Sequence, residues 1–395
     1  MADARFLVVR LGSLGDIVHT FPAVSSLRES FPASQITWLT HPRWESLVAS
    51  SGLATEIWAT ETRSMASLRE IIARIRKEKF TAGIDYQGLW KSAALPLFGG
   101  IPQRIGFSSE TIREWGVPIL YTDRVRCLTT HIAEQNGELS RRAGAKCIVA
   151  PFRLKDSAAD DAMVRESLRE RGVGRYVLLS PGGGWRSKCW PPERFGELAQ
   201  HIRESLGLRC VLNCGPGENY LAEAITAGSG KAEPIAHSGD MENLMALARG
   251  AECIVGGDTG PLHLAIALGT PSVSIYGPTD PRRNGPYPRF SSPDFAGTQA
   301  FAEVEQRVVA QVAQLAQAGV GLAKGVASPF VATSELSSEV SPSEEARAGA
   351  PRNIVLRAAS AVRDHRRIDE TDPAILKISV PEVFAAVCQL IGPRA

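Results

Sequence analysis

Short apolar segments alternate with amphipathic segments in the first part of the chain. Phe6–Val9, Ile36–Leu39 and Ala82–Asp85 are brief, mainly apolar runs of the kind that form buried strands. Between them, Ile17–Arg28 and Met65–Glu78 carry apolar side chains at helical spacing. Strands that alternate with helices in this way predict a parallel sheet covered by helices on both faces.

A second series of the same kind follows Lys155–Val173, a charged stretch that predicts a helix. The segments expected as its strands and helices are Tyr176–Leu179, Glu193–Leu206, Cys210–Asn213, Met241–Arg249, Cys253–Val255 and Ser272–Tyr276. The pattern therefore predicts an α/β protein with two Rossmann-like halves, and a ligand is expected in the cleft between them.

These two series set the expected domain boundaries. We expect an N-terminal domain over residues 1–160 and a C-terminal domain over 161–296 and 352–395. Because 395 residues exceed the size of one ordinary hydrophobic core, two domains also agree with the length of the chain.

One stretch breaks the alternation. Residues 297–351 are dominated by Ala, Ser, Gln, Glu, Val and Gly, which predicts a flexible insertion. Within it, Glu303–Gln317 is expected as a surface helix and Val326–Pro351 as a linker. Order is expected to return at a strand, Asn353–Leu356, and the chain to close with a helix at Pro381–Leu390.

Composition narrows the class of protein. Hydrophobic residues make up 44% and charged residues 22%, as in soluble globular proteins. A net charge of +2 predicts no general affinity for nucleic acid. The start, MADARFLVVRLGS, lacks the basic and apolar regions of a signal peptide, and no apolar run approaches the roughly 20 residues of a membrane span. We therefore expect a cytoplasmic protein.

Cysteine and histidine spacing gives no sign of a metal site. No CxxC, HxxxH or HxH pattern occurs. The cysteines, odd in number and scattered, are expected as free and mostly buried thiols of a reducing compartment: Cys127, Cys147, Cys189, Cys210, Cys214, Cys253 and Cys388.

The segment GGDTGPLHLAIALGTPSVSIYGPTD, residues 256–280, follows an expected strand. Asp258 or Thr259 can cap a helix whose first turn holds Pro261. The unpaired amides at such a helix start bind anions, and a diphosphate is the natural candidate. A well-capped turn that binds no ligand would explain the same residues.

A glycine-rich loop, SPGGGWRSKCWPPERF, follows another expected strand at Ser180–Phe195. Its glycines, Gly183 and Gly184 among them, allow a ligand to approach the backbone, and Lys188 adds a point charge suited to phosphate. The pattern is not a P-loop, because GxxxxGK[ST] is absent. An ordinary loop with an exposed lysine is the alternative.

Two further segments of the N-terminal half combine strand ends with polar residues. In VVRLGSLGDIVHTFPA, residues 8–23, Asp16 is either a helix cap or a general base that accepts a proton from a hydroxyl nucleophile. In GIDYQGLWKSAAL, residues 83–95, Asp85, Gln87 and Lys91 suit a sugar or a carboxylate. Arginines that could join them are Arg63, Arg104 and Arg113.

Taken together, these four segments resemble the ADP-heptose:lipopolysaccharide heptosyltransferases of glycosyltransferase family 9, and within that family most closely the heptosyltransferases I. The resemblance covers roughly residues 5–290 and resumes at 352–395. It implies a GT-B fold and an inverting, metal-independent reaction at the cytoplasmic face of the inner membrane.

The resemblance also implies roles for individual residues. Asp16 matches the catalytic aspartate of the family, and Lys188 its phosphate-binding lysine. The residues implied for donor binding are Gly183, Gly184, Lys188, Glu218, Asp258, Thr259, Gly260 and His263. The residues implied for acceptor binding are Gly15, Arg63, Gln87, Lys91 and Arg113.

The predicted function is transfer of heptose from ADP-L-glycero-D-manno-heptose to a Kdo hydroxyl of Kdo-lipid A. No cofactor and no metal are expected, and the protein is expected as a monomer at the inner face of the inner membrane. Met65–Phe80, a basic amphipathic segment, is a candidate for transient membrane contact, although an ordinary core-facing helix explains it too.

Other functions stay open at this point. The chain could be a heptosyltransferase II or use a different nucleotide sugar. A nucleotide-dependent oxidoreductase would also suit paired Rossmann-like halves, but the missing GxGxxG argues against it. A catalytically silent nucleotide-sugar binding protein would not need Asp16 and Lys188.

Overall fold

The chain folds into two compact units that meet in the sequence between Asp156 and Ser157. The structure, a computed structural model, describes residues 4–62, 64–112, 114–215, 217–287, 353–361 and 370–392. The predicted insertion 297–351, with its expected helix and linker, lies outside the described residues.

A six-stranded parallel sheet forms the centre of the first unit, with the order β3-β2-β1-β4-β5-β6. Its strands are β1 (Arg5–Val9), β2 (Gln35–Thr40), β3 (Glu56–Ala59), β4 (Ala82–Asp85), β5 (Gln103–Phe107) and β6 (Asp123–Val125). This is the strand order of the Rossmann fold, in which the connections change direction between the first and the fourth strand. Ligands of such folds bind beyond the carboxyl ends of the strands at this switch point.

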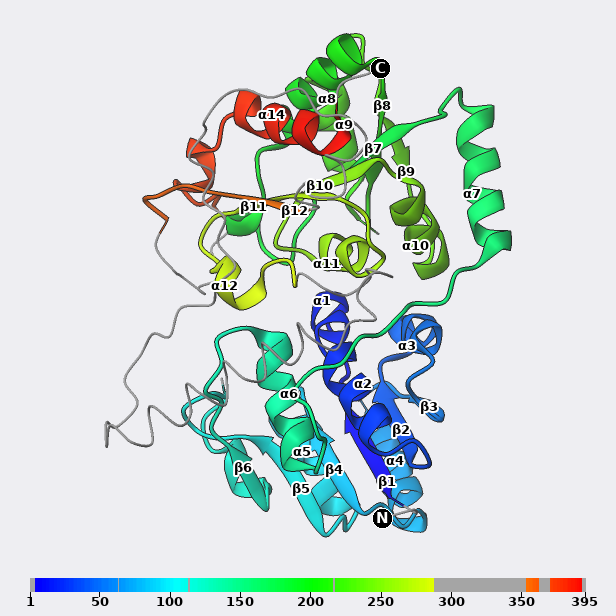
Figure 1. The fold of residues 1–395 in the computed structure, drawn as a ribbon, viewed down its shortest axis with the longest axis vertical. Helices are drawn as coiled ribbons and strands as arrows, with labels where there is room; N and C mark the ends of the chain where they lie inside the picture. Colours follow the sequence, from blue (N-terminus) through cyan, green and yellow to red (C-terminus); the bar gives the residue numbers. More distant parts are fainter. Residues whose placement is uncertain are drawn as a thin grey trace. The chain divides into compact units, whose positions relative to one another are not determined.

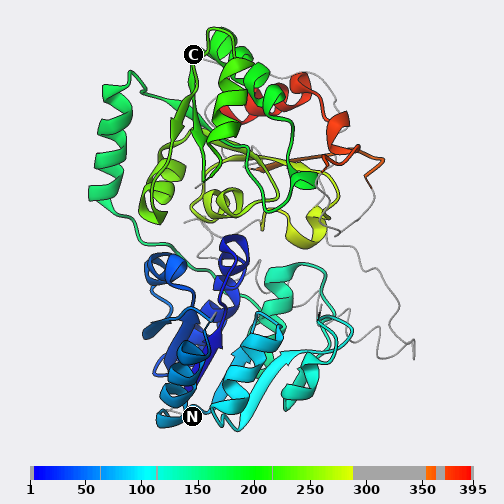
Figure 2. The ribbon, with the colours of Figure 1, turned by 180° about the vertical axis from the view of Figure 1, so that it is seen from behind.

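Helices cover both faces of this sheet (Figures 1 and 2). They are α1 (Leu14–Val18), α2 (Phe21–Ser30), α3 (Glu45–Ser51), α4 (Met65–Lys77), α5 (Trp90–Phe98) and α6 (Ile132–Arg142), with the 3₁₀ turns η1 (Pro42–Trp44) and η2 (Val117–Leu120). Helices α2 and α6 pack together on one face, and α4 and α5 on the other. Ile71 and Ile75 of α4 are buried with Leu7 and Val9 of β1, so the apolar side of α4 faces the core.

The single helix predicted over Ile17–Arg28 is wrong, because two helices, α1 and α2, occupy this region. Pro22 lies in the first turn of α2. Proline has no N–H to donate to the carbonyl of residue 18, so a continuous helix would lose a hydrogen bond there. Instead, the hydroxyl of Thr20 donates to the carbonyl oxygen of Asp16 at 2.8 Å, at the junction between the two helices.

The second unit contains another six-stranded parallel sheet, with the order β12-β11-β10-β7-β8-β9. Its strands are β7 (Tyr176–Ser180), β8 (Arg209–Asn213), β9 (Ile235–His237), β10 (Cys253–Gly257), β11 (Ser272–Tyr276) and β12 (Asn353–Arg357). Counted from β7, this is the same Rossmann order as in the first unit, with its switch point between β7 and β10. Each of the two sheets thus has the Rossmann order, which confirms the two Rossmann-like domains of the expected GT-B type of fold.

The helices of the second unit again lie on both faces of the sheet (Figure 1). They are α7 (Ala158–Glu170), α8 (Pro192–Leu206), α9 (Asn219–Ala227), α10 (Met241–Gly250), α11 (Gly260–Ala267), α12 (Pro281–Asn284) and α14 (Val380–Ile391), with the 3₁₀ turns η3 (Arg186–Lys188) and η6 (Ile375–Lys377). Among the described residues, no helix has the length and apolar character needed to cross a membrane.

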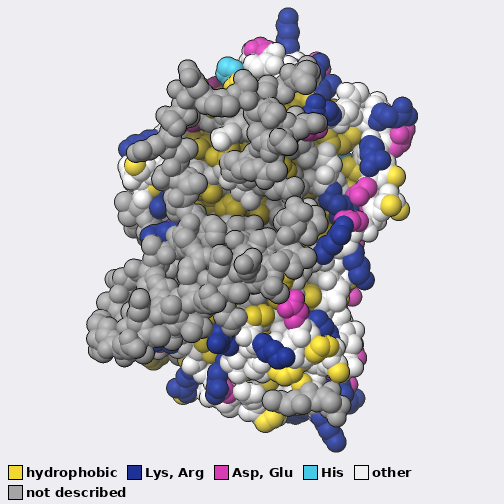
Figure 3. All heavy atoms as spheres, viewed as in Figure 1, with side chains coloured by type: hydrophobic (Ala, Val, Ile, Leu, Met, Phe, Trp, Pro, Cys, Tyr) yellow, Lys and Arg dark blue, Asp and Glu magenta, His cyan; other side chains and the backbone are white. Residues whose placement is uncertain are grey.

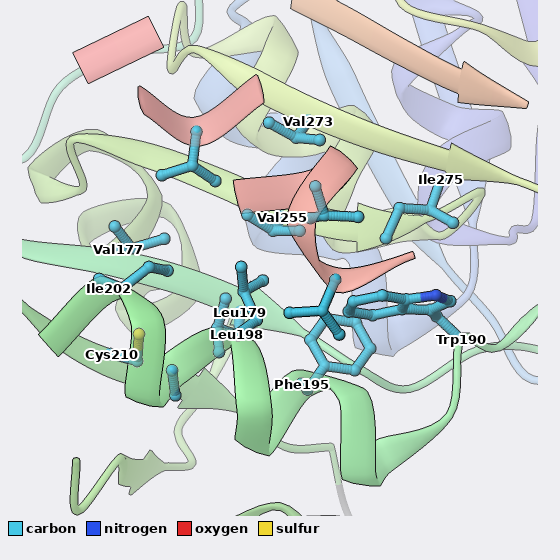
Figure 4. Close-up of a cluster of buried hydrophobic side chains, with 14 of the residues drawn as sticks. Val177, Leu179, Trp190, Phe195, Leu198, Ile202, Cys210, Val255, Val273 and Ile275 are labelled. Carbon is cyan, nitrogen blue, oxygen red and sulfur yellow. The ribbon is translucent and has the colours of Figure 1, made fainter. Parts of the chain in front are cut away.

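The main core of the second unit lies between the sheet and helices α8 and α14 (Figure 4). In this core Leu179 of β7 clusters with Val255 of β10 and with Phe195 of α8. Trp190 donates its indole N–H to the carbonyl oxygen of Ile378 at 3.0 Å. This bond ties the C-terminal segment to the loop that carries the predicted lysine site.

Candidate active site

The predicted site residues lie at the two switch points. In the first unit the described ones follow β1 and β4, and in the second unit most of them follow β7 and β10. Since each pair consists of neighbouring parallel strands, the loops after them meet at one edge of their sheet. Each unit therefore carries a candidate site of its own.

In the first unit, the carboxylate of Asp16 is held by the loop after β1. Its Oδ1 lies 2.7 Å from Nη2 of Arg10. Its Oδ2 accepts hydrogen bonds from the backbone N of Ser13 at 3.1 Å and from Ser13 Oγ at 2.9 Å. Asp16 thus helps to begin α1, yet 43% of its side-chain surface is exposed. A fixed and accessible carboxylate can also accept a proton from a bound hydroxyl.

Gln87 connects the loops after β1 and β4. Its Oε1 accepts hydrogen bonds from the backbone N of Leu11 at 3.1 Å and of Gly12 at 3.2 Å. The side-chain oxygen of this predicted acceptor residue is therefore engaged in positioning the loop that leads to Asp16.

The other predicted acceptor residues are spread out. Gly15 is buried within α1, next to Asp16. Lys91 is exposed in the first turn of α5. Arg63 and Arg113 lie outside the residues that the structure describes.

Asp85, a polar residue that the sequence marks and the last residue of β4, is part of the internal framework of the first unit. It is buried, and its Oδ2 accepts hydrogen bonds from Tyr121 Oη at 2.7 Å and Ser92 Oγ at 2.8 Å. Its Oδ1 accepts from the backbone N of Gln87 at 2.9 Å and of Gly88 at 3.2 Å. Burial raises the pKa of Asp85, although these donors act in the opposite direction. Asp85 therefore fixes the turn that carries Gln87.

In the second unit, Lys188, Asp258 and His263 form one cluster. Lys188 Nζ donates to Asp258 Oδ2 at 2.6 Å, and His263 Nε2 lies 2.9 Å from Asp258 Oδ1. The side chains of Lys188 and Asp258 are only 10% and 4% exposed. The cluster joins η3, after β7, to the start of α11, after β10.

The close approach of these two loops depends on a glycine. A Cβ atom on Gly257 would come within 2.8 Å of the carbonyl oxygen of Lys188, which real Cβ contacts do not allow. The ammonium group of Lys188 also lies 4.2 Å from the centre of the Trp185 ring, a cation–π contact. The lysine is thus oriented by a carboxylate and by an aromatic face.

Asp258 is ionised in this environment. Burial opposes its ionisation, but His263 and Lys188 outweigh that effect and hold the pKa of the Asp258 carboxyl far below its usual range. An anionic carboxylate does not attract phosphate directly. Instead, each of its two oxygens contacts one neighbour, Lys188 or His263, and so orients that side chain.

Thr259 is the residue that precedes the first turn of α11, as one of the two predicted caps. It is buried, and its Oγ1 has no hydrogen-bond partner among the described residues. Gly260 and Pro261 begin the helix. The sequence predicts that the backbone N–H groups of this first turn, which Pro261 lacks, bind an anion.

Glu218 follows β8 and lies against the glycine-rich loop. Its Oε2 accepts a hydrogen bond from the backbone N of Gly215 at 2.7 Å. A Cβ atom on Gly182 would come within 2.3 Å of its Oε1, so the carboxylate rests directly on the loop backbone. Gly183 packs similarly near Cys189, whereas Gly184 is exposed with no neighbour within 4 Å of a Cβ atom.

Sequence reasoning missed Arg10 as a member of the first site. It lies immediately after β1, where a charged residue is typical of an exposed strand end, yet it is buried and paired with Asp16. It also missed Asn284, whose Nδ2 lies 3.5 Å from Asp258 Oδ2. Arg10 lies within the segment of residues 8–23, where the sequence predicts a role only for Asp16 and its neighbours, and Asn284 lies just beyond the segment of residues 256–280.

Other predictions concern cysteines, metals and surface charge. The seven cysteines are free thiols, as predicted, but only three are buried and four are half-buried. In the described part of the chain, no group of three His, Cys, Asp or Glu side chains could hold a metal ion. On the described surface visible in Figure 3, Lys and Arg side chains occur at separate places on both units, with Asp and Glu among them.

Comparisons with known proteins agree with this architecture. A family model described as glycosyltransferase family 9 (heptosyltransferase) matches residues 68–292. A lipopolysaccharide heptosyltransferase 1 of Pseudomonas aeruginosa is 29% identical over 297 residues, which are 72% of this chain and 82% of that protein.

Two solved structures from Escherichia coli are also similar. Heptosyltransferase WaaC with ADP is 25% identical, with a TM-score of 0.57, over 72% of this chain and 90% of that chain. ADP-heptose lps heptosyltransferase II has a TM-score of 0.70 at 17% identity over 98% of both chains, which supports the fold. Because the family model covers more than half of the sequence, the chain belongs to glycosyltransferase family 9, the heptosyltransferases, and is a glycosyltransferase.

Proposed function

We propose that this enzyme transfers heptose from ADP-L-glycero-D-manno-heptose to a Kdo hydroxyl of the lipopolysaccharide inner core, with inversion at the anomeric carbon. The observation that carries the proposal is the pair of Lys188 and Asp258, which joins a cation to the residue before the N-cap of α11, a helix start that has no side-chain cap hydrogen bond. In this proposal residues 1–160 bind the acceptor, and 161–296 with 352–395 bind the donor.

The donor diphosphate would bind at Thr259 and Gly260, where helix amides and the helix dipole favour negative charge. Lys188 would stabilise the charge that grows on the departing ADP, with Asp258 and His263 orienting it. Glu218 would bind the ribose hydroxyls, and Gly183 and Gly184 would allow the nucleotide sugar to approach the backbone. The ADP in the solved structure of the Escherichia coli relative supports a nucleotide donor for this chain.

Acceptor binding is proposed for Gly15, Gln87, Lys91, Arg63 and Arg113. Kdo carries a carboxylate and lipid A carries phosphates, so cationic side chains suit such an acceptor. Lys91 is the described cation of this set, and its exposure at the start of α5 leaves it accessible to an anion.

The proposed reaction is a single displacement. The Kdo hydroxyl oxygen forms a bond to the anomeric carbon while the bond from that carbon to the ADP oxygen breaks, and ADP leaves with the bonding electrons. Asp16 would take the hydroxyl proton as general base. Because the new bond forms on the face opposite the leaving group, the configuration inverts.

Contact with the inner face of the inner membrane is proposed through charge. The apolar side of α4 is used inside the first unit, where Ile71 and Ile75 are buried. Three of the exposed cations of this region, Arg69, Lys77 and Lys79, would instead attract anionic lipid headgroups. Co-sedimentation with anionic vesicles that weakens as salt rises would support this contact, and equal binding to neutral vesicles would contradict it.

The test of the proposed function is a reaction with a defined donor and acceptor. The full chain is incubated with ADP-heptose and a delipidated Kdo acceptor, and the product is weighed by mass spectrometry and its anomeric configuration read by NMR. UDP- and GDP-sugars serve as alternative donors. Transfer from ADP-heptose alone supports the proposal, whereas transfer only from another nucleotide sugar, or none, would contradict it.

A further inference from the structure

Arg10 is buried although its partner is accessible. The residue is 5% exposed, and its Nη2 lies 2.7 Å from Asp16 Oδ1. The side chain of Asp16, in contrast, is 43% exposed. A buried guanidinium is costly to desolvate, and apolar residues often replace buried ion pairs without loss of stability. An arrangement that buries only the cation is therefore better explained by what it does to the exposed carboxylate.

The position of Arg10 is fixed from several directions. Its backbone N donates to the carbonyl oxygen of Leu39 at 3.1 Å, and its own carbonyl oxygen accepts from Trp38 Nε1 at 3.3 Å. Its Nη1 donates to the carbonyl oxygen of Tyr86, just after β4. The backbone of Arg10 is thus anchored to β2, and its guanidinium is held by the residue just after β4 as well as by Asp16.

The loop between Arg10 and Asp16 is fixed as well. Gln87 accepts hydrogen bonds from the backbone N of Leu11 and of Gly12, and Ser13 donates twice to the other oxygen of Asp16. The two oxygens of the carboxylate are consequently held by different groups. Rotation of the carboxylate would break contacts on both.

We propose that Arg10 is a positioning residue, which holds the Asp16 carboxylate in one orientation toward the acceptor hydroxyl. This inference rests on the proposed role of Asp16 as general base. A planar guanidinium can donate to Tyr86 and Asp16 from two different nitrogens, whereas the single ammonium nitrogen of a lysine cannot reproduce that fork. Misplacement of a reacting group by about 1 Å costs on the order of 100-fold in rate.

The experiment is a double-mutant cycle on transfer from ADP-heptose, with Arg10→Ala, Asp16→Asn and the combined variant. We expect Arg10→Ala to lower kcat on the order of 100-fold, while the affinity for ADP stays unchanged. If Arg10 acts through Asp16, the combined variant is no slower than Asp16→Asn alone. Losses that multiply in the combined variant, or normal kcat in Arg10→Ala, would overturn the inference.

Chemical rescue adds a readout that a purely structural role would not move. Guanidinium chloride at non-denaturing concentration should restore part of the activity of Arg10→Ala, and urea, a neutral molecule of the same shape, should not. Equal rescue by both, or by neither, counts against the proposal. Arg5→Ala is the matched control, because Arg5 begins β1, the strand that Arg10 follows, and pairs with Glu78 at the surface.

The outcomes separate this inference from the proposed function. An inactive wild-type protein, or a fully active Asp16→Asn, would reject the proposed function or its base, and the inference with it. An active wild type and an impaired Asp16→Asn, together with a normal Arg10→Ala, would reject only the inference. If Arg10→Ala does not fold, Arg10→Lys replaces it in the cycle, and multiplied losses there also overturn the proposal.

Discussion

Lys188 and Asp258 form a buried ion pair, with Nζ of the lysine 2.6 Å from Oδ2 of the aspartate. The pair joins residues that follow two neighbouring strands, β7 and β10. It gives the second unit a cation whose position does not depend on a ligand. The roles of this pair, and of the ion pair between Arg10 and Asp16 in the first unit, can be tested through activity and stability.

Asp16→Asn tests the general base. The amide can keep the start of α1 but cannot take a proton, so we expect normal folding and a loss of about 10²–10⁴-fold in kcat. Initial rates with ADP-heptose and the Kdo acceptor measure the loss, and circular dichroism measures the fold. Glu70→Gln, at an exposed position of α4, is the control and should keep full activity. Turnover near the wild-type rate in Asp16→Asn would remove this residue from the reaction.

Lys188→Met tests whether charge is needed for ADP. It leaves the Asp258 carboxylate buried with fewer partners, so we expect a loss of about 3 kcal/mol in the free energy of unfolding and a large loss of ADP affinity. Adding Asp258→Asn should restore much of the stability but none of the affinity. Urea unfolding and calorimetric titration with ADP measure the two effects. Recovery of ADP binding in the double variant would show that Lys188 is not the phosphate ligand.

The fall in the free energy of unfolding at acid pH tests the ionisation of Asp258. Its pKa in the folded protein lies far below its usual range, whereas an aspartate in the unfolded chain titrates near about 3.9. As the pH falls, the unfolded state therefore takes up the proton first, and stability present above this value is lost. We expect the free energy of unfolding to fall more steeply between about pH 5 and pH 3 in the wild type than in Asp258→Asn. Equal slopes in urea unfolding would contradict the assignment.

Gly182→Ala tests the place of Glu218. The new methyl group would overlap the Glu218 carboxylate, which can move because it is the end of a flexible side chain. We expect the fold to persist and the affinity for ADP to fall about tenfold, as for the loss of a hydrogen bond to a charged group. Gly174→Ala, before β7, has open space around its Cβ position and is the matched control. Unchanged ADP affinity in Gly182→Ala would argue against Glu218 as a ribose ligand.

Chelation tests the source of positive charge. If Lys188 and the amides of α11 stabilise the departing ADP, transfer should continue at an unchanged rate in excess EDTA. Dialysed enzyme assayed with and without Mg²⁺ provides the comparison. Activity that disappears with chelator and returns with a divalent cation would show that this charge is supplied by a metal instead.

Much of the fold and part of the site follow from local sequence. The predicted strands Ala82–Asp85 and Ser272–Tyr276 have the bounds of β4 and β11, because each is a short buried run bordered by turn residues. The strands β3, β5, β6 and β9 were not predicted. Three of them, β3, β6 and β9, are short strands at the edges of their sheets, and their exposed or half-buried residues weaken the apolar signal.

The contacts within the site could not be predicted without knowing which strands are neighbours in the sheet. The sequence marks Lys188 and Asp258 separately, as a phosphate ligand and as part of an anion-binding turn. Nothing local indicates that residues 70 positions apart form an ion pair, which follows from the adjacency of β7 and β10. Asp85 shows that such contacts can also remove a residue from the candidate site. It is buried against Tyr121, which belongs to a distant segment of the chain.

The repeated strand order has a consequence for how such enzymes diversify. Each half of the chain has its own binding edge, formed by its own loops. If the first half binds the acceptor and the second half the donor, as proposed, substitutions after β1 and β4 would change which sugar hydroxyl is glycosylated and leave nucleotide binding intact. A lineage would then keep one activated sugar and acquire new attachment points on its acceptor by altering half of a gene.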